Sequence, residues 1–126
     1  MKIISTPKGP TPAGHYSQAV VYGGVVYVAG MLGRAPGNTD ADLGGAGEQT
    51  RTALANVAAV LEAAGSGLAS ILRVTIYVSD IEHWDEVNAA FADVMGGHRP
   101  ARAIVPVKPF RDPYLVEIVA TAALGG

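Results

Sequence analysis

The sequence SQAVVYGGVVYVA, residues 17–29, contains two runs of β-branched and aromatic residues on either side of Gly23-Gly24. A glycine pair readily adopts the positive φ angles of a two-residue hairpin turn. Residues 17–22 and 25–29 therefore predict two adjacent antiparallel strands. The preceding residues 1–16 are rich in proline and glycine, so we expect an extended arm with at most one short strand.

Two later segments have the apolar spacing of amphipathic helices. Residues 47–64 predict the first helix, which Gly65 ends, with Gln49 and Asn56 expected away from its apolar face. The apolar face of this helix is formed by Leu54, Val57, Ala58 and Leu61. Asp80 is expected to cap the second helix. The apolar stripe of the second helix comprises Trp84, Val87, Phe91 and Val94.

Strands are predicted at residues 71–78, 103–107 and 115–122, whereas residues 30–45 lack periodicity and are expected to form a surface loop. The resulting order, hairpin, helix, strand, helix and two strands, is typical of a two-layer α+β fold. We expect a mixed sheet with both helices on one face, which leaves the other face for a partner or a second copy. A chain of 126 residues predicts a single domain over residues 1–126.

The composition excludes several classes of protein. Hydrophobic residues make up 49% of the chain and charged residues 16%, which argues against disorder. The absence of cysteine excludes disulfides, thiolate zinc sites and a cysteine nucleophile. A net charge of -2 opposes a nucleic-acid partner, and no apolar run reaches the ~18 residues of a membrane span. We therefore expect a cytoplasmic protein, and its low charge favours an oligomer.

The sequence lacks the spacing of known cofactor and metal motifs. Gly44-Gly45-Ala46-Gly47 precedes a helix, as phosphate loops do, but it fits neither the dinucleotide fingerprint nor the P-loop. His15, His83 and His98 are too scattered for a zinc motif. Ser66 follows a helix, whereas a nucleophile elbow lies between a strand and a helix. We expect no metal and no cofactor.

Three residues are candidates for binding or catalysis. Arg102 lies at the start of a strand, where its guanidinium could bind a carboxylate through two parallel hydrogen bonds, with a salt bridge or an exposed arginine as the alternative. Glu117 is the single carboxylate of an apolar strand, which points to function because burying a charge is costly. Strand alternation equally allows Glu117 to face solvent. Tyr16 could offer its hydroxyl to a ligand or pack at an interface.

Several segments occur in an order and spacing that resemble the RidA/YjgF family of reactive-intermediate deaminases over about residues 11–122. These segments are His15-Tyr16-Ser17-Gln18-Ala19, Val28-Ala29-Gly30, residues 49–56, Val87-Asn88, Arg99-Pro100-Ala101-Arg102 and Val116-Glu117-Ile118. The resemblance implies a chorismate-mutase-like fold and a homotrimer whose sheets form an inner barrel, with clefts between subunits. It also implies cofactor-free hydrolysis of enamines and imines, such as 2-aminoacrylate and 2-iminopropionate, to 2-keto acids and ammonia.

By the same resemblance, Arg102 binds the substrate carboxylate and Glu117 positions the attacking water. The other cleft residues that the resemblance implies are Tyr16, Gly30 and Asn88. Three positions depart from the serine, glutamine and cysteine that are common in the family, and these are Ala29, Met31 and Ile104. A backbone carbonyl near Ile104 could still hold the water. Ala29 and Met31 make the cleft less polar, and Met31 is expected to favour larger apolar substrates.

Three other functions stay open. A trimer that binds a small carboxylate without turnover would need the same arginine. RNA cleavage is opposed by the acidic charge balance and by the lack of interleaved basic and aromatic residues. An imine hydrolase dedicated to one pathway fits the altered cleft. The sequence thus predicts an imine deaminase and leaves its imine open.

Overall fold

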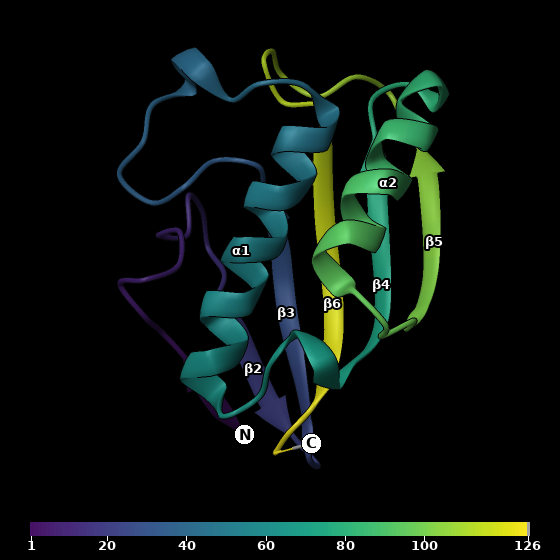
Figure 1. Ribbon diagram of the computed structural model, residues 1–126. Helices are drawn as coiled ribbons and strands as arrows, with labels where there is room; N and C mark the ends of the chain where they lie inside the picture. The colour runs from purple at the N-terminus through teal and green to yellow at the C-terminus, as the bar shows by residue number, and fades with distance from the viewer. Residues whose placement is uncertain (126) are drawn as a thin grey trace.

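The computed structural model describes residues 1–125, which form a six-stranded mixed sheet with two helices on one face (Figure 1). The strands are β1 (Lys2–Ile4), β2 (Ala19–Tyr22), β3 (Val25–Leu32), β4 (Ile71–Val78), β5 (Ala101–Pro106) and β6 (Val116–Ala123). The helices are α1 (Ala46–Ala64) and α2 (Trp84–Met95). The strand order is β1-β2-β3-β6-β4-β5, in which β4 and β5 are parallel and the other pairs antiparallel. The predicted α+β class, with both helices on one face of a mixed sheet, is confirmed.

The hydrophobic core lies between the helices and one face of the sheet. Every second residue of β6 from Val116 to Ala122 faces the helices and is at most 2% exposed. Leu54, Val57 and Leu61 of α1 are fully buried in the same core. Burying a side chain of this size contributes about 1.5–3 kcal/mol. Packing of α1 on the central strands therefore holds the two layers together.

The predicted hairpin is confirmed. Gly23 has a φ of 60° and Gly24 a φ of 78°, which are the angles that a two-residue turn between twisted strands requires. Val21 pairs with Val26 across the turn, so these two side chains lie on the same face of the hairpin, the face that packs on the core.

The third strand, β3, extends to Leu32, whereas the sequence predicted its end at Ala29. Its register with β6 shifts between Val28 and Met31, where Ala29 and Gly30 form a bulge. Beyond the bulge the core-facing residues change from even to odd numbers, so the alternation that predicts a strand is interrupted. Residues 30–32, expected in a surface loop, are therefore part of the sheet.

Both predicted helices are confirmed, but their buried faces differ from the expected ones. Gln49 and Asn56 are 0% and 3% exposed, although the sequence placed them away from the apolar face. Their amides are buried because they hydrogen-bond to the backbone of neighbouring loops. On α2, Met95 is buried, whereas Trp84 at the first turn is 38% exposed.

Two predicted boundaries also shift. Asp80 caps a short 3-10 helix, Ile81–His83, by accepting a hydrogen bond from the Glu82 N–H at 2.9 Å. The helix α2 follows that turn without a side-chain cap of its own. The strand β5 begins at Ala101, before its predicted start, because parallel pairing with β4 already includes that residue.

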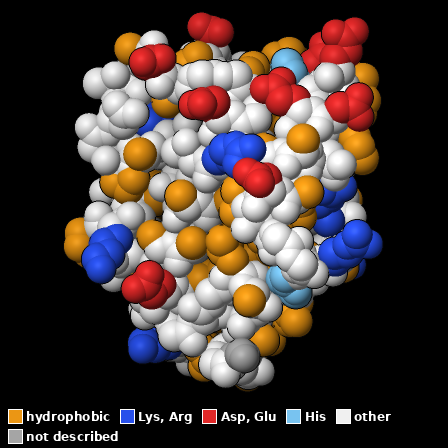
Figure 2. Space-filling view, in the orientation of Figure 1, with side chains coloured by type: hydrophobic (Ala, Val, Ile, Leu, Met, Phe, Trp, Pro, Cys, Tyr) orange, Lys and Arg blue, Asp and Glu red, His pale blue; other side chains and the backbone are white. Residues whose placement is uncertain are grey.

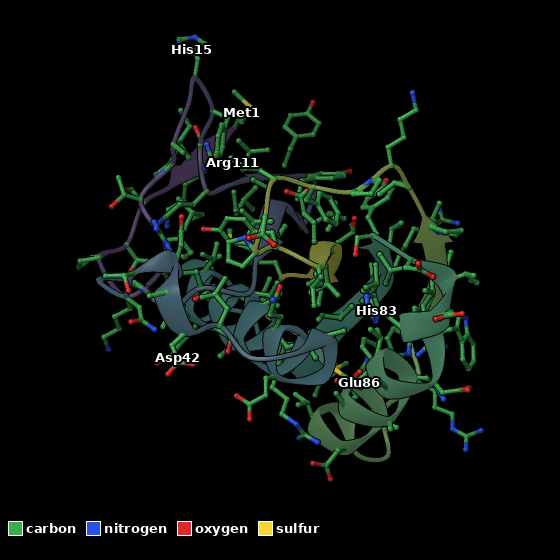
Figure 3. The ribbon with its side chains drawn as sticks, turned by 90° about the horizontal axis from the view of Figure 1, so that it is seen from above. Met1, His15, Asp42, His83, Glu86 and Arg111 are labelled. Atoms are coloured by element: carbon green, nitrogen blue, oxygen red, sulfur yellow. The ribbon has the colours of Figure 1, made fainter. Side chains whose placement is uncertain are left out.

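The glycine-rich stretch at the start of α1 packs against a carboxylate from α2. The N–H of Gly47 donates to Glu86 Oε2 at 2.8 Å. A Cβ at Gly45 or Gly47 would lie 3.2 Å or 3.1 Å from that carboxylate, so glycine allows the close approach. The negative charge complements the positive end of the helix dipole. Glu86 belongs to α2 and is labelled between the two helices in Figure 3, and its carboxylate thus takes the position that an anion would occupy.

Candidate active site

The two residues predicted for catalysis point to opposite faces of the sheet. Arg102 of β5 is in register with Val74 of β4, whose side chain is fully buried beneath the helices. Glu117 lies between the core residues Val116 and Ile118, so its side chain faces the side without helices. One copy of the chain therefore holds two separate groups, called here the Arg102 half-site and the Glu117 half-site.

In the Arg102 half-site, a guanidinium group is oriented by α2. Arg102 Nη1 donates to Asn88 Oδ1 at 2.8 Å. The guanidinium carbon lies 5.0 Å from the centre of the Phe91 ring and 5.8 Å from that of Trp84, which are cation–π distances. Partial burial lowers the pKa of Arg102 below its ordinary value. Within residues 1–125 no carboxylate pairs with Arg102, so most of its five N–H donors can serve a ligand.

A cavity of about 460 Å³ opens beside Arg102. Its volume lies within the ~300–1,000 Å³ range of small-molecule sites. The charged and polar residues that line it are Asn88, His98, Arg99 and Arg102, and the apolar ones include Phe91 and Met95. His98 is fixed by a hydrogen bond between its Nε2 and the Ile71 carbonyl at 2.7 Å, whereas Arg99 is exposed. The structure thus brings the predicted Asn88 and Arg102 together at one cavity.

In the Glu117 half-site, a half-buried carboxylate packs against glycine. Glu117 is opposite Leu32 of β3 and Tyr77 of β4 in the sheet register. A Cβ on Gly30 would lie 2.9 Å from the Glu117 carboxyl carbon, so the bulge brings the β3 backbone against the carboxylate. Within residues 1–125 Glu117 has no cationic partner. The carboxylate is therefore available to hold a water or a substrate.

Tyr16 belongs to the same side of the molecule as Gly30. The two residues line a second cavity, of about 150 Å³, between the N-terminal arm, the end of β3 and the β5–β6 loop. The Tyr16 hydroxyl accepts a hydrogen bond from the Ala13 N–H at 3.2 Å, which leaves its own proton to donate. Met31 borders this cavity while its side chain, 4% exposed, belongs to the core.

The remaining two predicted residues, Ala29 and Ile104, lie in β3 and β5, and neither lines the two cavities described above. The Ala29 N–H donates to the Gln18 carbonyl at 2.9 Å and so stabilises the bulge. Ile104 packs its side chain against the core beside Ile76 of β4. It lies on β5, an edge strand of the sheet, where backbone groups on the outer side have no neighbouring strand.

Sequence reasoning missed a set of buried amides that hold the loops around the small cavity. Asn56 Nδ2 donates to the carbonyls of Leu32 and Arg34 at 3.0 and 2.9 Å. Gln49 Nε2 donates to the Pro113 carbonyl at 3.0 Å, and its Oε1 accepts from the Leu115 N–H at 2.9 Å. No periodicity distinguishes such amides from surface residues, because their partners are distant backbone groups.

A third buried amide holds the N-terminal arm. Gln18, 3% exposed, accepts from the Thr6 N–H at 2.7 Å and donates to the carbonyls of Thr6 and Pro10 at 3.0 and 2.8 Å. The arm carries Tyr16 and lines the small cavity. Gln18 therefore fixes one wall of the small cavity.

Sequence reasoning also missed a charged network at the rim of the small cavity. The Asp40 carboxylate accepts from the Tyr114 hydroxyl and from Arg34 Nη1, the latter at 2.9 Å. The Tyr114 hydrogen bond, followed by the Arg34 charge, lowers the pKa of Asp40, while burial raises the pKa of Tyr114. The network joins the loop before α1 to the β5–β6 loop.

The surface charges do not form a single basic patch on the face drawn in Figure 2. The Lys and Arg side chains lie in separate places there, and acidic side chains lie among them. Within residues 1–125 no group of three or more His, Asp or Glu side chains could hold a metal ion. In the same range, no helix has both the length and the hydropathy to span a membrane.

Comparison with known proteins gives consistent similarities. Residues 6–124 match the family described as endoribonuclease L-PSP. The chain is 36% identical over 124 residues to the 2-iminobutanoate/2-iminopropanoate deaminase of Bos taurus, with 98% of this chain and 90% of that protein covered. RidA from an Antarctic Psychrobacter superposes with a TM-score of 0.91 at 31% identity, over 98% of this chain and 100% of that one. E. coli TdcF with bound serine has a TM-score of 0.87 at 30% identity, over 98% of both chains.

Proposed function

The chain belongs to the endoribonuclease L-PSP family, which includes the RidA and YjgF proteins, and on this premise we propose that it hydrolyses 2-imino acids to 2-keto acids and ammonium. The Bos taurus relative is named as such a deaminase. The observation that carries the proposal is the pair of half-sites, in which Arg102 lacks an acidic partner and Glu117 a basic one within residues 1–125. Together they supply a carboxylate anchor and a base for water.

The reaction needs positioning more than a strong nucleophile. An imine carbon is already electrophilic, so water attacks it readily when both are held in place. Arg102 binds the substrate carboxylate through its planar fork, and Glu117 orients a water and accepts one of its protons. The water oxygen bonds to C2 while the π electrons of the C=N bond move to nitrogen, which takes up the proton held by Glu117, and a carbinolamine results. Glu117 then transfers the hydroxyl proton of the carbinolamine to its nitrogen, the C2–N bond breaks, and ammonia leaves the 2-keto acid; in water the ammonia becomes ammonium.

We further propose that a cleft between two copies forms the complete site. Arg102 and Glu117 lie on opposite faces of one sheet, so a substrate can meet both when the β5 edge of one copy approaches the Glu117 half-site of another. The face without helices offers apolar surface for such contact, including Ile3, Tyr22 and Tyr27, which are 60%, 69% and 48% exposed. A homotrimer of about 39 kDa, three times the 12.9 kDa chain, would bring Arg102 and Glu117 of neighbouring copies together and would also cover the apolar face.

Two other functions have specific support. The description of the family names an endoribonuclease, although the net charge of -2 and the scattered cations of Figure 2 are unfavourable for RNA binding. TdcF was crystallised with bound serine, which is compatible with a carboxylate-binding protein that performs no chemistry. The cytoplasmic location expected from the sequence stays a prediction.

Ammonium release from freshly generated 2-iminopropionate and 2-iminobutanoate tests the proposal. Wild-type protein should accelerate release well above the uncatalysed rate, whereas Glu117→Gln should lose most of the acceleration while still binding 2-oxobutanoate by calorimetry. Binding without acceleration by the wild type would favour the carboxylate-binding alternative. Incubation with single-stranded RNA provides the third arm, and cleavage that survives in Glu117→Gln would favour the ribonuclease.

A panel of nascent imino acids with small, branched and aromatic side chains distinguishes a general deaminase from one dedicated to a single pathway. A general enzyme should process the panel with similar kcat/KM. A dedicated enzyme should favour one member by more than the ~10- to 200-fold that a single methylene contact provides.

A further inference from the structure

The small cavity beside Gly30 carries two arginines and is called here the Arg34/Arg111 pocket. Besides Gly30 it is lined by Tyr16, Met31, Arg34, Arg111 and Tyr114. The lining includes no aspartate or glutamate. Figure 3 shows Arg111 on the side of the sheet away from the helices, the side to which the Glu117 half-site also belongs. The pocket is therefore a cationic recess next to the proposed reaction centre.

The two guanidinium groups have donors to spare. Arg34 uses Nη1 to bind Asp40 at 2.9 Å, and the same carboxylate oxygen accepts from Tyr114. A guanidinium has five N–H donors, so most of those of Arg34 are not used by this contact. Within residues 1–125 Arg111 is exposed and makes no ion pair. Of the two cations that line the pocket, Arg34 is paired with Asp40, whereas Arg111 has no acidic partner and can bind an anionic group.

The backbone that carries both arginines is held by α1. Asn56 donates to the Arg34 carbonyl at 2.9 Å, which fixes the chain where it leaves β3. Gln49 binds the Pro113 carbonyl and the Leu115 N–H, just beyond Arg111. Both amides are buried. The two cations are therefore presented by anchored backbone, as a binding site requires.

The pocket adjoins the place where the proposed substrate would react. Gly30 lines it, and the Glu117 carboxyl carbon lies 2.9 Å from the position of a Cβ on that residue. A cavity of about 150 Å³ is smaller than the ~300–1,000 Å³ of a complete ligand site, so it suits one part of a ligand. Because Met31 is only 4% exposed, it offers a ligand little apolar surface. The substrate preference of the pocket is then set mainly by the N–H donors of Arg34 and Arg111.

Building on the proposed function, we infer that the Arg34/Arg111 pocket binds a second carboxylate at the end of the substrate side chain. The preferred substrate is then a 2-imino dicarboxylic acid, with its C1 carboxylate on Arg102 and its distal carboxylate on Arg111 and Arg34. Hydrogen bonds from a guanidinium to a carboxylate are charge-assisted and strong, so they favour a substrate with a distal carboxylate over one with an aliphatic side chain. An aliphatic side chain in the pocket would make none of them.

Substrate preference of Arg111 variants tests the inference. The measured quantity is the ratio of kcat/KM for the imines formed from aspartate and glutamate to kcat/KM for 2-iminopropionate. The ratio should exceed one in the wild type and fall by about tenfold or more in Arg111→Ala, the effect of losing hydrogen bonds to a charged group. Lys108→Ala removes a neighbouring exposed cation of the same loop that does not line the pocket, and it should keep the wild-type ratio. A ratio unchanged by Arg111→Ala would overturn the inference.

Product binding separates failure of this inference from failure of the proposed function. Calorimetry with 2-oxoglutarate and 2-oxobutanoate needs no turnover. If the protein hydrolyses no imine, the deaminase proposal fails, yet tighter binding of 2-oxoglutarate by wild type than by Arg111→Ala still supports the pocket. If 2-iminopropionate is hydrolysed but 2-oxoglutarate binds both proteins equally, the deaminase stands and the second carboxylate site is excluded.

Discussion

Gly30→Ala adds one methyl group where β3 meets the Glu117 carboxylate. The φ of Gly30 lies outside the positive region, so the backbone accepts alanine. The new Cβ would lie 2.9 Å from the Glu117 carboxyl carbon and 3.2 Å from each oxygen. Carbon atoms are comfortable at about 3.5–4.0 Å, so the carboxylate must move by roughly 0.5 Å. It ends a flexible side chain and can do so.

The expected effect is on catalysis rather than on stability. Alanine reduces the entropy of the unfolded chain, which contributes about 0.4–1 kcal/mol and offsets the strain of moving the carboxylate. The free energy of unfolding should therefore change by less than about 1 kcal/mol. Since a misplacement of ~1 Å can cost about 100-fold in rate, kcat for 2-iminopropionate should fall by about tenfold. The KM should change little, because in the proposed mechanism the substrate carboxylate binds to Arg102, away from Gly30.

Two other glycines give matched controls. Gly67→Ala places a Cβ with no atom within 4 Å, so kcat should stay at the wild-type value. The free energy of unfolding should rise by about 0.4–1 kcal/mol, because no strain offsets the lower entropy of the unfolded chain. Gly33→Ala places a Cβ 2.5 Å from Gln49 Cβ and 2.6 Å from its backbone, which α1 holds in place, so overpacking should cost about 1–3 kcal/mol or more. Steady-state kinetics and urea unfolding of the three variants provide the test. Wild-type kcat in Gly30→Ala would refute the role given to the Glu117 carboxylate.

Three further perturbations have definite expectations. Arg102→Lys keeps the charge but loses the planar fork, so its turnover should be far below that of the wild type. Arg102→Ala should abolish binding of 2-oxobutanoate, as measured by calorimetry. Normal turnover in Arg102→Ala would exclude the deaminase. Met31→Gln buries an amide in the core and should lower the free energy of unfolding by about 1–3 kcal/mol. Because the Met31 side chain is 4% exposed, any shift of substrate preference toward small imines should be smaller than the effect of Arg111→Ala, and a larger shift would contradict the core position of Met31. The pKa of Asp40 is lowered on folding, so its stabilisation is complete above the ordinary value of 3.8 and is lost as pH falls through the folded-state value. Urea unfolding of Asp40→Asn should therefore differ from wild type at pH 6 and converge with it in acid, and a pH-independent difference would contradict this.

The regular parts of the fold could be predicted because each has a local signal. The Gly23-Gly24 pair needs positive φ, and alternation along residues 71–78 and 115–122 follows the two faces of a sheet. The bulge at Ala29-Gly30 could not be predicted, since it shifts the alternation by one residue. This bulge is also the feature that brings Gly30 against the Glu117 carboxylate.

The candidate site was predicted residue by residue but not in space. Alternation left open whether Glu117 faces the core, and register with β4 was needed to place Arg102 on the helix side. The buried amides Gln49 and Asn56 bind backbone groups far along the chain, so no local pattern reveals them. Arg111 gave no signal because it lies in an irregular loop.

Mixed oligomers of two inactive variants test most directly whether Arg102 and Glu117 act together from different copies. Arg102→Ala and Glu117→Gln, carrying different tags, are refolded together, and trimers that contain both are isolated by the two tags. In the proposed trimer, every mixed ring would hold one cleft where the Glu117→Gln copy supplies Arg102 and the Arg102→Ala copy supplies Glu117, so activity should recover to about one third of wild type. Mixed trimers as inactive as their parents would show that both residues must belong to one copy, contradicting the shared cleft.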